Sequence, residues 1–191
     1  MRISTCFQRV MASLLACSVF WALPVCCSSE KHQSAQELAE GYYWYEAVFL
    51  DTEEVQKAFS TASASYPKYE IVPDHFHVTV QYKPEPRHED LYGTPVTVHI
   101  LGYAGGTVQD PQENITSENE GLQVRMTSPD EGMQALIDNT DKNWHITGSY
   151  TVAAKYTEQL DFSDSTPVDI TLEGVFGVAD SDGNVVLEQQ D

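Results

Sequence analysis

Two short motifs carry the residues of this chain that are best suited to chemistry. His77-Val78-Thr79 and His145-Ile146-Thr147 each place a threonine two positions after a histidine. Side chains at that spacing on a β-strand lie on one face, about 6–7 Å apart, so both can contact one tetrahedral phosphate. An imidazole titrates near neutral pH and can take or give a proton. A threonine hydroxyl can donate a hydrogen bond to an oxygen on which charge develops.

A pair of such strands facing one another would supply a base, an acid and two hydroxyl donors. That set suffices to open a 2′,3′-cyclic phosphate without a metal ion. A single His-x-Thr motif is most simply part of an ordinary half-buried strand. Two motifs in equivalent positions of two matched halves favour a functional pair, so the arrangement of the halves decides between these interpretations.

The first half has the order strand, helix, strand. Tyr43–Leu50 is rich in aromatic and aliphatic residues, which predicts a strand. Asp51 follows as a helix N-cap, with Glu54 three residues later, and apolar residues then recur at helical spacing. Phe76–Tyr82 alternates strictly and predicts the strand that carries the first motif.

The second half repeats this order. Leu122–Met126 predicts a strand, and Ser128-Pro129-Asp130-Glu131 predicts a helix start with Ser128 as N-cap. Trp144–Tyr150 then predicts the strand that carries the second motif. The repeated order indicates an α+β domain with two related lobes.

The remaining segments complete the predicted domain. Thr94–Tyr103 and Val168–Val178 predict further strands, and Val185–Leu187 predicts a short return strand. The acidic segment Gln109–Glu120 is predicted to be a loop that separates the two halves.

Strand alternation predicts a polar face on each motif strand. His75, His77, Thr79 and Gln81 share one face of the first, and His145, Thr147 and Ser149 share one face of the second. We expect these two polar faces to converge on one cleft.

The motif strands also resemble those of a known superfamily. His77-Val78-Thr79-Val80-Gln81-Tyr82 and His145-Ile146-Thr147-Gly148-Ser149-Tyr150 are similar to the paired motifs of the 2H (two-histidine) phosphoesterases. The closest similarity is to the cyclic phosphodiesterase domain of fungal-type tRNA ligases, and it covers roughly residues 42–188. The sequence departs from the pattern at Gly148, where many members carry a bulkier aliphatic residue.

The resemblance implies a fold and a set of site residues. The fold would be bilobal, with two antiparallel sheets, outer helices and a pseudo-two-fold internal duplication, and both motifs would lie in the cleft between the lobes. His77 and His145 would be the catalytic acid and base, with either assignment open. Thr79 and Thr147 would bind the substrate phosphate, and no cofactor would be needed.

Other polar residues near the motifs are secondary candidates. His75, Lys83 and Ser149 are predicted to contact the substrate. An alternative is a metal chelate formed by His75 and His77 and completed by His88 or His99. Because zinc sites need three or four ligands held close together and these histidines are scattered, we predict no metal.

Two tyrosines end the matched motif strands. Tyr82 and Tyr150 are able to stack on a nucleobase. Their pleat position instead favours packing within the domain, and we predict packing.

The N-terminal segment has the layout of an export signal. Arg2 and Arg9 precede an apolar run from Val10 to Cys27, which predicts that residues 1–27 are a signal peptide. An uncleaved anchor is the alternative, and Cys17 or Cys26 would be the attachment site in a lipoprotein. We expect the chain beyond it, a linker over 28–41 and a domain over 42–191, to lie outside the cytoplasm, with the membrane contacted only through the leader or a lipid.

Charge limits the class of substrate. Arg2 and Arg9 are two of ten basic residues, so eight remain beyond the leader against 29 acidic ones, a net charge of −21. This field repels polyanions and disfavours long nucleic acids. The sequence therefore predicts a metal-independent phosphodiesterase for a small cyclic phosphate, nucleotide or short RNA end. The alternative is an exported, non-enzymatic binding protein that retains the fold.

Overall fold

A computed structural model describes residues 43–110, 114–140, 143–180 and 183–188, so the predicted leader and linker lie outside the described residues. Within these ranges the chain forms an α+β fold with seven strands and two α-helices. The strands are β1 (Tyr43–Leu50), β2 (His77–Tyr82), β3 (Pro95–Asp110), β4 (Ile115–Thr127), β5 (His145–Tyr150), β6 (Thr166–Asp180) and β7 (Val185–Val186). The helices are α2 (Thr52–Ala62) and α3 (Glu131–Asn139), with short 3₁₀ turns η1 (Glu89–Leu91) and η2 (Ala154–Gln159).

The strands form one antiparallel sheet. Its order is β2-β1-β6-β3-β4-β5, and β7 pairs with β6. Reversing this order exchanges β1 with β4, β2 with β5 and β3 with β6, so the strand order repeats between the two halves. The expectation of two separate sheets is wrong, because β6 pairs with both β1 and β3 and thereby joins the halves.

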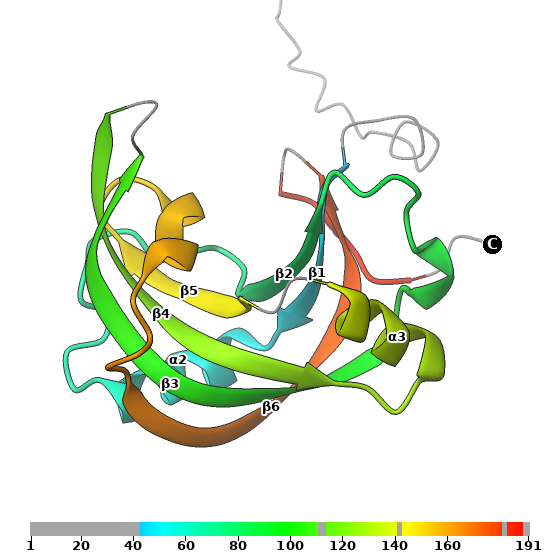
Figure 1. Ribbon diagram of the computed structural model, residues 1–191, viewed down its shortest axis with the longest axis horizontal. Helices are drawn as coiled ribbons and strands as arrows, with labels where there is room; N and C mark the ends of the chain where they lie inside the picture. The colour runs from blue at the N-terminus through cyan, green and yellow to red at the C-terminus, as the bar shows by residue number, and fades with distance from the viewer. Residues whose placement is uncertain (1–42, 111–113, 141–142, 181–182, 189–191) are drawn as a thin grey trace, which may run out of the picture. The chain divides into compact units, whose positions relative to one another are not determined.

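Curvature brings the two ends of this sheet together. β2 and β5 are the outermost strands, yet they contact each other, as the U-shaped sheet in Figure 1 allows. Both motif strands are therefore neighbours in space.

The main core lies on one face of the sheet, against the helices. Strand residues such as Val48, Val78 and Ile146 are fully buried there, together with Phe59 of α2 and Met133 of α3. Because side chains alternate along a strand, the motif residues project from the opposite face. That face is only partly covered, since the motif histidines and threonines are all half-buried.

The first helix begins as predicted. Asp51 is its N-cap, and its carboxylate accepts a hydrogen bond from the Glu54 backbone N–H at 3.0 Å. β1 has the bounds that its composition predicts. Local chemistry determines both features, so the sequence alone suffices to find them.

The second helix begins two residues later than predicted. Asp130, and not Ser128, is the N-cap, because its carboxylate accepts from the Met133 backbone N–H at 2.8 Å. The Ser128 hydroxyl instead donates to the Pro95 carbonyl at 3.0 Å. Ser128 thus links the helix start to β3.

The predicted acidic loop is also wrong. β3 continues to Asp110 and β4 begins at Ile115, so most of the segment belongs to a long hairpin. Ser117, Asn119 and Glu120 are buried within it. Strands tolerate such buried polar groups when each group is hydrogen-bonded.

Among the described residues, no helix is both long enough and apolar enough to cross a membrane.

Candidate active site

The first motif strand has a β-bulge directly after its threonine. Thr79 pairs with Ala47 and Gln81 pairs with Glu46, so Val80 is one extra residue on β2. Bulges bend a strand and re-aim its side chains, and they are common beside functional sites.

The second motif strand has its bulge at the same place. Thr147 pairs with Gly121 and Tyr150 pairs with Asn119, so β5 also carries one extra residue after the threonine. The equivalence of the halves therefore extends to the irregularities that flank the motifs.

Each motif histidine is held by the same kind of hydrogen bond. His77 Nδ1 lies 3.3 Å from the His75 carbonyl, and His145 Nδ1 lies 3.2 Å from the Asn143 carbonyl. A carbonyl oxygen only accepts, so Nδ1 carries the proton in both rings. In the neutral form Nε2 is then the free basic nitrogen, as a general base requires.

His77 lies among aromatic rings of β1. Its ring stacks on Tyr45 with 4.7 Å between centroids and lies 5.9 Å from Phe49. The pKa of His77 is lowered to about 4, chiefly by burial. The hydrogen bond to the His75 backbone opposes this shift, and the charges of His145 and His75 add to it. His77 is therefore neutral over most of the acid range.

His145 has a different electrostatic environment. Burial lowers its pKa as well, but the hydrogen bond to Asn143 and the carboxylate of Glu158 both act to raise it. Glu158 thus favours the protonated ring of His145, and its charge is not among the influences on His77.

A pocket of about 430 Å³ opens between the two motif strands. Its walls include Thr79 of β2 and His145 of β5. The described residues that line it are Thr79, Val80, Gln81, Tyr82, Thr140, Asn143, Trp144, His145 and Glu158. His77 does not line it but is close enough to His145 for their charges to interact. The structure thus brings three of the four predicted motif residues to one region.

The other predicted contacts lie outside this lining. Thr147 is half-buried on β5, and His75 is exposed just before β2. Lys83 is exposed directly after β2, in a left-handed backbone conformation with φ of 46°.

Ser149 is not available to a substrate, contrary to the prediction. It is fully buried, its hydroxyl donates to the Glu120 carboxylate, and its oxygen accepts from the Tyr69 backbone N–H at 2.9 Å. Strict alternation predicted that Ser149 shares a face with His145. The bulge in β5 breaks that alternation and turns Ser149 inward.

The packing of Phe59 explains why a glycine stands at position 148. A Cβ atom at this position would lie 2.5 Å from Cε1 of Phe59. The aromatic ring from α2 therefore occupies the space that a side chain would need.

Tyr82 does not pack as predicted, since it is 55% exposed and lines the pocket.

Two further residues of the site, Tyr45 and Glu158, were missed from the sequence. Alternation in Tyr43–Leu50 puts Tyr45 on one face with Phe49, which was a usable signal once β1 was paired with β2. Glu158 had no comparable signal, because it follows β5 in an irregular segment.

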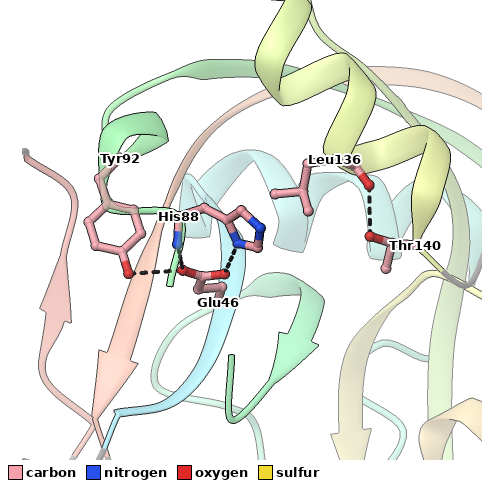
Figure 2. A network of polar contacts seen from close by, with 5 residues as sticks. All are labelled: Glu46, His88, Tyr92, Leu136 and Thr140. Carbon is pink, nitrogen blue, oxygen red and sulfur yellow. Dashed lines mark hydrogen bonds and ion pairs between the residues drawn. The ribbon is translucent and has the colours of Figure 1, made fainter. Parts of the chain in front are cut away.

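The histidines of the chelate alternative are engaged elsewhere. His88 Nδ1 lies 2.8 Å from the buried carboxylate of Glu46, which also accepts from the His88 backbone N–H and from the Tyr92 hydroxyl (Figure 2). His99 lies between the hydroxyls of Thr127 and Thr171. Across the described ranges, no group of three or more His, Cys, Asp or Glu residues is placed to hold a metal ion.

Comparisons with known proteins add no assignment. No protein-family model matches the chain, and neither curated proteins nor solved structures give a significant match.

Proposed function

We propose that this protein is a metal-independent phosphodiesterase of the 2H type, which opens a 2′,3′-cyclic phosphate on a nucleotide or a short RNA end. One observation carries the proposal: two His-x-Thr strands from opposite ends of one sheet lie side by side at one pocket. The matching bulges and the matching Nδ1 hydrogen bonds support it, because chance motifs would not share their surroundings.

The two environments suggest different roles for the histidines. His77, surrounded by aromatic rings and neutral down to about pH 4, is the general base. His145, beside the Glu158 carboxylate, is the general acid. The Thr79 hydroxyl, which lines the pocket, donates to a non-bridging oxygen of the phosphate.

The reaction is then one in-line displacement at phosphorus. His77 Nε2 takes a proton from water as the water oxygen bonds to phosphorus. The bond from phosphorus to one ribose oxygen breaks, and that oxygen takes the proton from His145 Nε2. The product is a nucleoside phosphomonoester, and a second proton transfer restores both rings.

Turnover of a panel of 2′,3′-cyclic nucleotides by the full chain, with and without EDTA, tests this proposal. We expect phosphomonoester products at a rate that EDTA does not change. Binding of the cyclic nucleotides without turnover would contradict the enzyme and favour a binding protein. Loss of activity in EDTA with recovery in zinc would favour the His75-x-His77 chelate.

The leader and the charge shape where this activity would operate. We propose export, on the basis of Arg2, Arg9 and the apolar run that follows them. Cell fractionation tests it, and full-length protein in the soluble cytosol would contradict it. The net charge of the remaining chain supports a small phosphodiester over a long nucleic acid.

A further inference from the structure

We propose that the pocket beside His145 holds the nucleobase of the substrate and that Glu158 selects guanine. This inference rests on the proposed function and names the substrate within its class. It follows from three features of the pocket: an exposed aromatic ring, a carboxylate on an anchored backbone, and the position of both relative to the two motifs.

The aromatic ring is that of Tyr82. It is 55% exposed although it lines the pocket, and Thr79 of the same strand lines the pocket beside it. Tyr45 contacts it edge to face, with 6.1 Å between centroids. The ring is therefore held next to a proposed phosphate-binding residue, where a base attached to the same ribose would stack on it.

The carboxylate is that of Glu158, on η2. Among the described residues it is the only carboxylate that lines the pocket, and its charge acts on both His145 and Tyr82. Asn143 Nδ2 donates to the Glu158 backbone carbonyl at 3.2 Å, which fastens η2 to the start of β5. The preceding Thr157 is fully buried and accepts from Asn119 Nδ2 at 2.9 Å. Glu158 is thus presented by a backbone anchored on both sides.

A carboxylate distinguishes the bases by their hydrogen-bonding edges. Guanine presents N1–H and N2–H side by side, and a carboxylate accepts both in parallel. In adenine and cytosine the amino group stands next to a ring nitrogen that is itself an acceptor, which a carboxylate opposes. Uracil offers one N–H between two carbonyl oxygens. A bidentate pair of this kind discriminates by about 1–3 kcal/mol, or roughly 5- to 150-fold.

The test is the ratio of kcat/KM for guanosine and adenosine 2′,3′-cyclic phosphates. We expect the full chain to prefer the guanosine compound roughly 5- to 150-fold. Glu158→Gln should reduce this preference to a few-fold. The NH2 group of the glutamine is a hydrogen-bond donor, so it cannot pair with the second guanine N–H, which is also a donor. Tyr82→Ala should raise KM for both compounds. Glu54→Gln, an exposed acid on α2, is the matched control and should keep the preference.

The ratio of the two kcat/KM values separates base recognition from the effect of Glu158 on the pKa of His145. A change in the pKa of His145 would alter the rates for both compounds by the same factor and leave their ratio unchanged. Equal kcat/KM for both compounds, or an unchanged preference in Glu158→Gln, would overturn the inference. If no cyclic nucleotide is turned over, the proposed function fails. Base recognition is then tested separately, by measuring the affinities of guanosine and adenosine 3′-monophosphates by calorimetry. Tighter binding of the guanosine compound, lost in Glu158→Gln, supports the inference, and equal affinity overturns it.

Discussion

Glu46 and Glu120 occupy equivalent positions in the two halves of the sheet. Both are fully buried, and each comes one residue before the strand residue that pairs with a motif threonine. Each carboxylate also accepts a backbone N–H from a loop, that of His88 for Glu46 and that of Lys68 for Glu120. A buried carboxylate therefore lies at the position of the bulge in each half of the sheet.

Ser149→Ala tests the hydrogen bonds around the buried Glu120 carboxylate. The change removes a donor from Glu120 and an acceptor from the Tyr69 backbone N–H. We expect the free energy of unfolding to fall by about 1–3 kcal/mol, as measured by denaturant titration. KM of the folded enzyme should stay the same, because Ser149 is buried.

Ser60→Ala, on the exposed side of α2, is the matched control and should change stability by no more than about 0.5 kcal/mol. A raised KM in Ser149→Ala, at unchanged stability, would restore Ser149 as a substrate contact.

Gly148→Ala tests the packing behind the second motif. The new Cβ would collide with the Phe59 ring, so we expect a loss of about 1–3 kcal/mol in unfolding free energy. The same change made in a Phe59→Leu background should cost less, because the smaller side chain leaves room. Strictly additive losses in this double-mutant cycle would contradict the contact.

The sequence predicted those features that local chemistry controls. The alternation of Phe76–Tyr82 and Trp144–Tyr150 revealed the motif strands, and the Asp51 carboxylate revealed the start of α2. Neither depends on partners far along the chain.

Features that depend on distant partners were missed. Asn119 is polar in sequence, yet it is buried in β4 because Thr157 and the Ala153 carbonyl satisfy it from beyond β5. Glu158 directly follows Thr157, so its position at the pocket also depends on this contact between β4 and η2. The turning of Ser149 required knowledge of the bulge, which single-strand alternation does not contain.

The pH dependence of stability tests the environment of His77. Its folded pKa of about 4 is below the ordinary value of 6.5, so the unfolded chain binds more protons between these two pH values. Stability is therefore fully present above pH 6.5 and falls as the pH drops toward 4, by about 3 kcal/mol for this group. His77→Gln should lack this part of the pH dependence in denaturant titrations. Identical pH profiles for the two proteins would contradict a lowered pKa of His77 in the folded protein.

The pH dependence of the rate tests the assigned roles. The base His77 is neutral above about pH 4, and the acid His145 is protonated only below a pKa that burial has lowered from 6.5. We expect a bell-shaped kcat/KM profile with its optimum on the acid side of pH 6.5. Glu158→Gln removes a charge that raises the pKa of His145, so it should move the alkaline limb to lower pH. An alkaline limb that does not move would contradict the role of His145 as the acid.

The central claim is that His77 and His145 together carry the reaction, and the most direct measurement is kcat for 2′,3′-cyclic nucleotides in EDTA. His77→Ala and His145→Ala should each lower kcat by roughly 10²–10⁴-fold while circular dichroism shows a retained fold. His99→Ala serves as the control, since His99 lies between Thr127 and Thr171 on the central strands, and it should keep the wild-type rate. Wild-type turnover in either His77→Ala or His145→Ala would contradict the two-histidine mechanism.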